Sequence, residues 1–315
     1  MRGYYYQTLF LIPSNTISYK TFVLYSLLLL VLLITPIIKK TMLTSVLIST
    51  YFKENPDWLD ASLRSIYDSQ TRKPDEIVLV QDGPLTPALL TVIDRWKNAL
   101  EDILTIVVNK KNLGLARSLN EGLKVAKGDI IIRMDSDDIA FPHRIEKLVQ
   151  FMEQHPDVDV VGAWVTEFIG STDNVRSIRK VPETSEQIYQ FGKHRNPLNH
   201  PSVAFRRDRV VEHGGYTHFL LFEDYCLWAQ LLMKGYRFYN FQEPLLWFRT
   251  SADMFSRRGG WHYAVTELKF QHYLYGIGYI TLPMMLRNSI VRFTGRIMPN
   301  SLRRFMYSRF MRGKI

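Results

Sequence analysis

From residue 45 onwards the chain alternates short apolar segments with amphipathic ones, and this order restricts the fold more than any other feature of the sequence. Apolar runs at residues 45–50, 76–82, 104–109 and 129–135 have the length of strands, and helical spacing of apolar side chains follows each of them. Repeated strand–helix order predicts an α/β fold, with a largely parallel sheet covered by helices on both faces. Binding sites in such sheets form beyond the carboxyl ends of the strands, so the residues after each strand are the candidates for function.

The later part of the chain has a less regular order of elements. Residues 159–165, 175–182 and 202–207 read as strands, and residues 223–235 read as a helix that ends at Gly235. The sequence has no repeat and no low-complexity linker, and 46% hydrophobic residues in a chain of 315 suffice for a large core. We therefore expect one main domain over residues 42–265.

The sequence carries a net charge of +10, but the cations gather at its two ends. Residues 1–41 contribute +4 and residues 268–315 contribute +9, both without an acid, which leaves −3 for the residues between them. A mildly acidic centre speaks against a nucleic-acid partner, which needs a basic surface. The single cysteine, Cys226, excludes an intrachain disulfide and a cysteine-ligated metal cluster.

Both ends also have features of membrane contact. Residues 21–38 form an apolar run between Lys20 and Lys39, just long enough for a membrane-spanning helix. Because Met42 directly precedes the first strand, residues 1–41 are either a membrane anchor or an upstream extension from a misassigned start, and hydropathy leaves both open. Residues 266–315 mix aromatic and aliphatic side chains with cations, which predicts a basic amphipathic segment at a membrane surface.

Acids are concentrated after the fourth predicted strand. Asp135 ends that strand, and Asp137 and Asp138 follow. Alternate side chains of an extended segment project to one side, so Asp135 and Asp137 face a common point. Carboxylates this close repel unless a cation lies between them, and oxygen ligands suit Mn²⁺ or Mg²⁺. The alternative is an acidic turn in which Asp138 caps the helix that begins near Pro142.

Two other enzyme classes with characteristic residues after a strand do not fit the sequence. Phosphatases of the haloacid dehalogenase type need a Thr or Val two residues after the second acid of D-x-D, and Ile139 occupies that place. Dinucleotide-binding dehydrogenases need G-x-G-x-x-G after the first strand, and residues 49–55 contain no glycine.

Six segments in order along the chain resemble family 2 glycosyltransferases of the GT-A fold, over roughly residues 43–250. They are SVLISTYFKENP, VQDGP, NLGLARSLNEGL, MDSDD, NPLNHPSVAFRR and FEDYCLWAQLL. The ordered series is much more specific than any one of its members. The processive members of the family carry Q-x-x-R-W after the catalytic base, and CLWAQLLMKGYRF lacks it, which indicates a single-transfer enzyme.

The resemblance implies a UDP-sugar donor site at the strand ends. Asp82 would contact the uracil or ribose, Asp135 the ribose and the metal, and Asp137 the metal that bridges the diphosphate, with Asp138 in support. The remaining donor-binding candidates are Thr50, Tyr51, Glu54, Asn112, Gly114, Arg117, His200 and Arg249.

Several of these candidates also have a purely structural interpretation. Asp82 precedes Gly83 in a good turn sequence, and Arg117 suits a solvated helix face. His200 suits a buried hydrogen bond, and Arg249 suits an ion pair. Two further residues of the third segment, Asn120 and Gly122, are expected to pack their helix.

The resemblance also implies that Asp224 is the catalytic base, with Glu223 contacting or orienting the acceptor. A carboxylate beside the acceptor hydroxyl can take its proton as the hydroxyl attacks the anomeric carbon, and one displacement inverts that centre. The alternative is that both acids only cap a helix. A helix start stabilises a charged carboxylate, which lowers its pKa and weakens it as a base.

The acceptor implied by the resemblance is a sugar linked through a diphosphate to a lipid. We expect glucose or galactose to move from UDP to GlcNAc-diphosphate-undecaprenol, in β or β1,3 linkage, during assembly of an O-antigen or another polysaccharide. The enzyme would then work at the cytoplasmic face of the bacterial inner membrane, peripherally or through one span. A nucleotidyltransferase of related fold and a non-catalytic membrane-associated scaffold stay open as alternatives.

Overall fold

The structure is a computed structural model of the chain, and it describes residues 24–26, 42–250 and 260–297. By its contacts the chain divides into two units, residues 1–41 and residues 42–315. In the first unit residues 24–26 form a helical turn, and the rest of the apolar run at 21–38 lies outside the described residues. None of the helices in the described ranges has both the length and the apolar character that crossing a bilayer requires.

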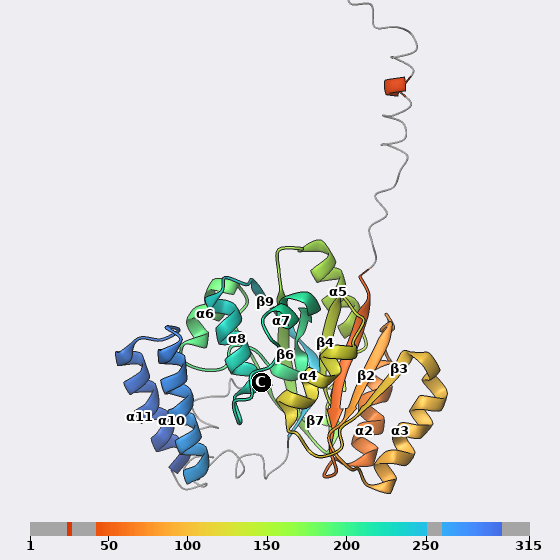
Figure 1. Ribbon diagram of the computed structural model, residues 1–315, viewed down its shortest axis with the longest axis horizontal. Coiled ribbons are helices and arrows are strands. Elements are labelled where there is room, and N and C mark those ends of the chain that lie inside the picture. The colour runs from red at the N-terminus through yellow and green to blue at the C-terminus, as the bar shows by residue number, and fades with distance from the viewer. Residues whose placement is uncertain (1–23, 27–41, 251–259, 298–315) are drawn as a thin grey trace, which may run out of the picture. The chain divides into compact units, whose positions relative to one another are not determined.

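The second unit is built on one sheet, to which nine of the described strands belong (Figure 1). Along the sheet the order is β3-β2-β1-β4-β8-β6-β9-β5, and β7 pairs with β6 outside this path. The strands are β1 (Thr44–Thr50), β2 (Glu76–Gln81), β3 (Leu104–Val108), β4 (Ile130–Asp135), β5 (Ile139–Ala140), β6 (Val160–Ile169), β7 (Ser171–Arg179), β8 (Ala204–Arg206) and β9 (Phe238–Arg249).

The sheet has a parallel half and a mixed half. β1 pairs in parallel with β2 and β4, and β2 pairs in parallel with β3. β8 runs antiparallel to both β4 and β6, whereas β6 and β9 are parallel. The predicted α/β fold is confirmed, and the parallel order holds where a helix crosses between successive strands. β6 and β7 are joined through Gly170 alone, at φ 72°, and so tight a connection makes them antiparallel.

Helices cover both faces of this sheet, as predicted. They are α2 (Pro56–Ile66), α3 (Pro87–Leu100), α4 (Leu115–Val125), α5 (Arg144–Gln154), α6 (Ser185–Gly192), α7 (Arg207–Glu212), α8 (Glu223–Met233), α10 (Trp261–Gly276) and α11 (Leu282–Ile297), with 3₁₀ turns at η1 (Glu101–Ile103) and η2 (His200–Ser202). The first begins as its sequence predicts: Asn55 Oδ1 accepts from the backbone N–H groups of Asp57 and Trp58, and Pro56 opens the first turn.

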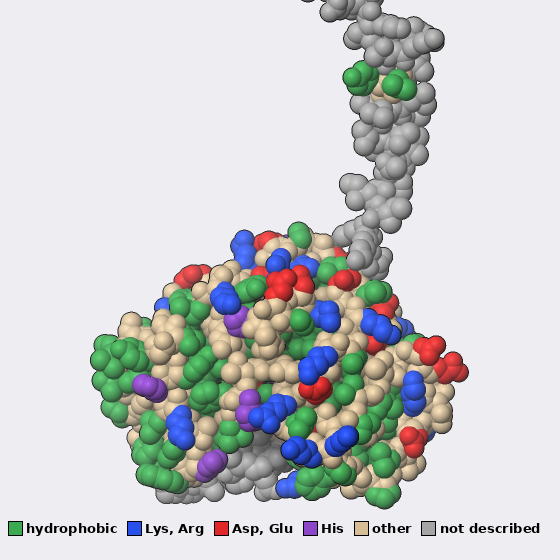
Figure 2. Space-filling model, viewed as in Figure 1, with side chains coloured by type: hydrophobic (Ala, Val, Ile, Leu, Met, Phe, Trp, Pro, Cys, Tyr) green, Lys and Arg blue, Asp and Glu red, His purple; other side chains and the backbone are tan. Residues whose placement is uncertain are grey.

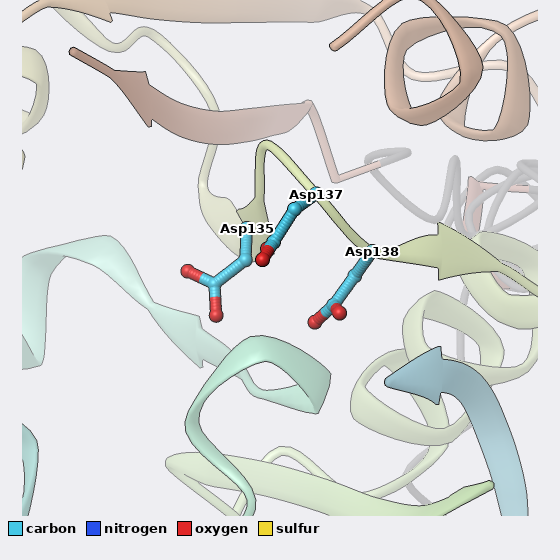
Figure 3. Close-up of side chains that lie close together, drawn as sticks. All are labelled: Asp135, Asp137 and Asp138. Carbon is cyan, nitrogen blue, oxygen red and sulfur yellow. The ribbon is translucent and has the colours of Figure 1, made fainter. Parts of the chain in front are cut away.

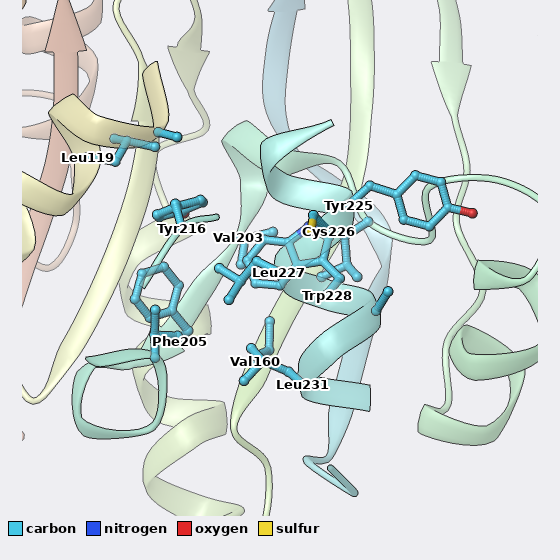
Figure 4. Close-up of a cluster of buried hydrophobic side chains, with 14 of the residues drawn as sticks. Leu119, Val160, Val203, Phe205, Tyr216, Tyr225, Cys226, Leu227, Trp228 and Leu231 are labelled. Carbon is cyan, nitrogen blue, oxygen red and sulfur yellow. The ribbon is translucent and has the colours of Figure 1, made fainter. Parts of the chain in front are cut away.

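The core lies in two layers because alternate side chains of each strand point to opposite faces. Val46 and Ile48 of β1 pack with α2, α3 and α5 on one face. Leu47 packs on the other face with α4, α8 and α10. Figure 4 shows the second layer, in which Trp228 of α8 is fully buried near Tyr216 and Phe205.

Helix α4 lies directly against the parallel half, and a glycine makes this approach feasible. A Cβ on Gly122 would lie 2.4 Å from Leu47 Cδ1 and 2.9 Å from Val80 Cγ2. Asn120, two residues earlier, exchanges hydrogen bonds with the backbone of Tyr216 in both directions (2.8 and 2.9 Å). Both residues therefore pack the helix, as the sequence predicts.

The C-terminal helices α10 and α11 form a hairpin at one side of the sheet (Figure 1). Phe270 and Leu274 of α10 are fully buried in the same layer as α8. Residue 265, where we expected the catalytic domain to end, lies within α10. The basic segment expected at 266–315 thus begins as a helix packed on the domain, and residues 298–315 lie outside the described residues.

Candidate active site

The carboxyl ends of the four parallel strands meet at one edge of the sheet. Thr50 is in register with Gln81, Ser49 with Asp135, and Gln81 with Val108. The loops that leave these strands therefore start side by side. This is the arrangement that the strand–helix order predicts for a binding site.

Three acids lie together on the loop between β4 and β5; we refer to Asp135, Asp137 and Asp138 as the acid cluster. One carboxylate oxygen of each lies within 4.8 Å of the others, and all three carboxylates point to the same side of the loop (Figure 3). Asp138 is fully buried, and its Oδ1 accepts from the backbone N–H of Arg249 (2.8 Å). Its Oδ2 has no hydrogen-bond partner among the residues that the structure describes.

Two carboxylates of the acid cluster, those of Asp137 and Asp138, have raised pKa values. Burial, followed by repulsion from Asp135 and Glu54, raises the pKa of Asp137 to about 7. Burial and then repulsion from Asp137 raise the pKa of Asp138 well above its ordinary value. Asp138 does not cap α5, which begins at Arg144 without a side-chain cap. The interpretation of this stretch as a simple acidic turn therefore has no hydrogen bond to support it.

The acid cluster fits a divalent cation. Three convergent carboxylates, one with an unpartnered buried oxygen, offer the hard oxygen ligands that Mg²⁺ and Mn²⁺ prefer. A cation there would also relieve the repulsion that raises the pKa of Asp137 and of Asp138. Asp135 and Asp137, the two predicted metal ligands, both belong to this group.

Two arginines that the sequence analysis did not single out lie behind the acid cluster. Arg133 on β4 and Arg144 at the start of α5 are both fully buried. The guanidinium of Arg133 donates to the Asp135 carboxylate, and that of Arg144 donates to the carbonyl oxygens of Arg133 (2.5 Å) and Pro201 (2.6 Å). Burial lowers the pKa of Arg144 to about 9. The signal in the sequence was an arginine inside the apolar run IIIRM.

Arg249 binds the loop of the acid cluster with its guanidinium, and its backbone N–H donates to the Asp138 carboxylate. Its Nε donates to the carbonyl oxygen of Asp137 (2.7 Å) and its Nη1 to that of Gly170 (3.0 Å). The guanidinium also lies 4.7 Å from the ring centres of both Trp58 and Phe168. These contacts fix the end of β9 beside the loop, and the expected side-chain ion pair is not among them.

The end of β1 and the loop after it contribute further side chains to this edge of the sheet. Glu54 Oε2 accepts from Ser136 Oγ (2.5 Å), which ties the β1 loop to the acid cluster. Thr50 is buried, with no hydrogen-bond partner for its hydroxyl in the described part of the chain. Tyr51 is partly exposed at 37%. The ring of Tyr51 is thus exposed at this edge, whereas the hydroxyl of Thr50 lies below the surface.

Asp82, after β2, organises the loop that leads into α4. Its carboxylate accepts from the backbone N–H groups of Leu113 (2.7 Å) and Gly114 (3.1 Å), and its carbonyl oxygen accepts from the Asn112 amide (3.2 Å). Gly114 has φ 82°, which a side chain would strain. Asp82, Asn112 and Gly114 are therefore brought together, whereas Arg117, in the first turn of α4, is exposed.

The two acids at the start of α8 have raised pKa values, although they lie at a helix start. Burial is the first cause for both Glu223 and Asp224, and it outweighs the stabilisation that we expected from the helix dipole. Asp224 Oδ2 accepts from the Asn196 amide (2.6 Å), and the Asp135 carboxylate also raises the pKa of Asp224. Leu221, two residues before Glu223, has a positive φ of 72°, a strained conformation of the kind that clusters at functional sites.

His200 is engaged in a structural contact. Its Nε2 lies 3.1 Å from the hydroxyl of Tyr216, and its ring packs at the edge of Trp228. Burial and the nearby Arg133 hold the pKa of His200 well below its usual value, so the imidazole is neutral near pH 7. The buried hydrogen bond considered from the sequence is the arrangement observed.

The chain matches a family profile and several known proteins. Residues 45–215 match the profile described as glycosyl transferase family 2. A UDP-Gal:alpha-D-GlcNAc-diphosphoundecaprenol beta-1,3-galactosyltransferase of Escherichia coli is 38% identical over 268 residues, which cover 85% of this chain and 96% of the relative. The amylovoran biosynthesis glycosyltransferase AmsE of Erwinia amylovora is 38% identical over 272 residues, or 85% of this chain and 99% of that protein.

Solved structures share the fold at low sequence identity. S. aureus TarS in complex with UDP-GlcNAc matches with a TM-score of 0.57 at 18% identity, covering 85% of this chain and 75% of that one. The mannosyltransferase PcManGT of Pyrobaculum calidifontis, in complex with GDP-Man and Mn²⁺, matches with a TM-score of 0.55 at 16% identity, covering 91% and 86%.

Proposed function

The chain belongs to glycosyl transferase family 2 and is a glycosyltransferase, and on that premise we propose that it transfers one galactose from UDP-galactose to a GlcNAc-diphosphate-lipid with a β1,3 linkage. One observation carries the choice of substrates: the Escherichia coli enzyme named for this reaction is 38% identical over 96% of its own length. Glucose is the alternative donor sugar from the sequence. No observation favours the alternative that the chain is a nucleotidyltransferase. Measured transfer of a sugar distinguishes an enzyme from a non-catalytic scaffold.

The donor would lie along the edge where the parallel strands end. Asp82 and the loop that it organises face the nucleoside, with Thr50, Tyr51 and Glu54 at the neighbouring strand end. Asp135 and Asp137 would hold Mn²⁺ or Mg²⁺, with Asp138 behind them. Such a cation, when bound, neutralises charge on the diphosphate leaving group.

Asp224 acts as the base in this proposal. Its carboxylate takes the proton of the acceptor hydroxyl while the new bond to the anomeric carbon forms and the bond to the UDP oxygen breaks. A raised pKa makes Asp224 a stronger base than an ordinary carboxylate. The Asn196 amide donates to one oxygen of this carboxylate and holds it in place. Because the donor leaves from the opposite face, an α-linked UDP-sugar gives a β-linked product.

A lipid-linked acceptor requires the enzyme to work at a membrane surface, which for this pathway class is the cytoplasmic face of the bacterial inner membrane. The association is peripheral, or through one span if residues 1–41 form an anchor. Product formation would contribute one sugar to a lipid-linked repeat unit.

A transfer assay tests the proposal. Purified protein is incubated with UDP-galactose, UDP-glucose or UDP-GlcNAc, Mn²⁺ and a GlcNAc-diphosphate-lipid analogue, and the linkage of the product is determined by NMR. We expect a β1,3-galactosyl product that disappears with EDTA. Asp224→Asn should lower kcat by about 10²–10⁴-fold, the usual contribution of a general base. Absence of turnover with every donor would reject the function, and full activity of Asp224→Asn would reject the base.

A further inference from the structure

The hairpin of α10 and α11 has a polar seam between its two helices. Glu267 of α10 is fully buried and pairs with Arg292 (3.1 Å) and Arg296 (3.0 Å) of α11. The buried Asn288 of α11 donates to Gln271 of α10 (3.2 Å). Helices in water usually turn charges outward and apolar side chains toward their neighbour. Much of the polar surface of α11 instead faces its partner helix.

The opposite side of α11 is apolar and exposed. Leu282, Leu286, Ile290 and Ile297 are 47%, 53%, 68% and 47% exposed, and their spacing places them on one side of the helix. Trp261, at the start of α10, is 68% exposed. We call these five residues the apolar stripe. Figure 2 shows hydrophobic side chains gathered over this end of the molecule.

The hairpin itself carries no exposed acid in residues 260–297. The one acid in residues 260–297 is the buried Glu267, whereas Lys269 and Arg287 are exposed. Residues 298–315 add five cations and no acid. Such a surface is attracted to anionic lipid headgroups, each cation near the surface contributing about 1 kcal/mol. A second copy of the same surface would instead bring like charges together.

Exposed apolar side chains also lie in the segment just before Asp224, the candidate base. Phe219 and Phe222, in the segment that leads into α8, pack on Phe270 of α10 with ring centres 5.3 and 4.5 Å apart. Leu220 and Leu221 between them are 49% and 40% exposed. The start of α8 and the hairpin therefore form one packed body that joins the candidate base to the apolar stripe.

We propose that the apolar stripe inserts into the surface of an anionic bilayer and thereby orients the candidate base toward an acceptor held in that bilayer. The choice of lipid as the partner rests on the proposed function. The sequence alone predicted a basic amphipathic segment at a membrane surface over residues 266–315, without saying which side chains make the contact. In the structure Arg292 and Arg296 are bound to Glu267, so the apolar side of α11 makes the contact and the remaining cations supply the attraction.

Site-specific labelling of the full chain tests this contact. The one natural cysteine, Cys226, is buried, so a fluorophore sensitive to polarity can be attached at Ile290→Cys with wild-type protein as the labelling blank. Phosphatidylcholine–phosphatidylglycerol vesicles should shift the emission to the blue and lower quenching by aqueous iodide several-fold. The fluorescence reports on the surroundings of residue 290 itself. Binding of the chain to vesicles through residues 1–41 alone therefore does not produce the same change.

Val125→Cys, on an exposed position near the end of α4, is the matched control and should stay accessible to iodide. Equal iodide access at residue 290 with and without vesicles, or equal responses of both labels, would overturn the proposal. So would protection of the Ile290→Cys label that rises with protein concentration before vesicles are added, since a second copy would then cover the stripe. No nucleotide sugar or acceptor is present, so this result stands apart from the transfer assay.

Discussion

At the scale of single residues, charge is divided unequally within the acid cluster. Asp135 has the buried guanidinium of Arg133 as a partner, whereas Asp137 is buried among other acids and has a pKa of about 7. Asp138 has one oxygen bound to a backbone N–H and the other without a partner in the described residues. Near neutral pH the acid cluster without a cation therefore carries less than its full negative charge.

The raised pKa of Asp137 predicts how metal binding depends on pH. Because the folded pKa of about 7 exceeds the unfolded value of about 3.9, the native state binds more protons in between, and the stability of the metal-free protein falls as pH rises through this window. Mn²⁺ should therefore raise Tm more at pH 8 than at pH 5.5. Thermal unfolding with Mn²⁺ or with EDTA at the two values measures this difference.

Asp137→Asn should lose most of the Tm gain with Mn²⁺, and Asp68→Asn, an exposed acid just after α2, should keep it. A full Tm gain in Asp137→Asn would remove Asp137 from the set of metal ligands.

The hydrogen bond between Asn196 and Asp224 gives a second prediction, on the pH dependence of transfer. Burial raises the pKa of Asp224 and the Asn196 amide lowers it, so Asn196→Ala should raise that pKa further. Since the base acts only when deprotonated, the acidic limb of kcat/KM against pH should move to higher pH. Gln150→Ala, on the exposed side of α5, is the control. An unmoved acidic limb in Asn196→Ala would mean that another group is the base.

The sequence located Asp82 and the acid cluster because these residues stand at or just after the end of a strand with a local apolar pattern, and their roles in donor and metal binding stay predictions. It missed the buried Arg133 and Arg144, since a charged side chain is expected outside and burial depends on partners distant in sequence. Asn196 was missed for the same reason, because its contact with Asp224 spans 28 residues.

At the scale of elements, β1 to β4 and the helices α2 to α5 follow from local periodicity, whereas β5 and several later strands depend on distant pairing. β5 has two residues and exists through Trp247 and Leu246 of β9, more than a hundred residues away. No local pattern specifies so short a strand. The antiparallel place of β8 between β4 and β6 likewise depends on the assembled sheet.

The polar seam between α10 and α11 gives a prediction at this scale. Glu267→Gln leaves two partly buried arginines without their anionic partner, so the free energy of unfolding should fall by about 3 kcal/mol. Glu121→Gln removes an exposed ion pair with Lys124 and should cost at most about 1 kcal/mol. Denaturant unfolding followed by circular dichroism measures both. Equal midpoints for the two variants would mean that the seam adds little to stability.

At the scale of the whole molecule, every candidate site residue belongs to the unit of residues 42–315. A chain that begins at Met42 should therefore fold and transfer galactose to a water-soluble acceptor analogue with a kcat within about twofold of the full chain. The full chain assayed in parallel is the control. A large loss of kcat in the shorter chain would show that residues 1–41 contribute to the site.

The division of the sheet into a parallel half and a mixed half also bears on how such enzymes diversify. The acid cluster and the β1 and β2 loops all precede residue 139, whereas Glu223-Asp224 come after β8 and the hairpin comes after β9. Under the proposed function, substitutions around Glu223-Asp224 and in the hairpin change the acceptor end and leave the acids before residue 139 in place. In this way one ancestral gene gives rise to several enzymes that use the same activated sugar to build different surface polysaccharides.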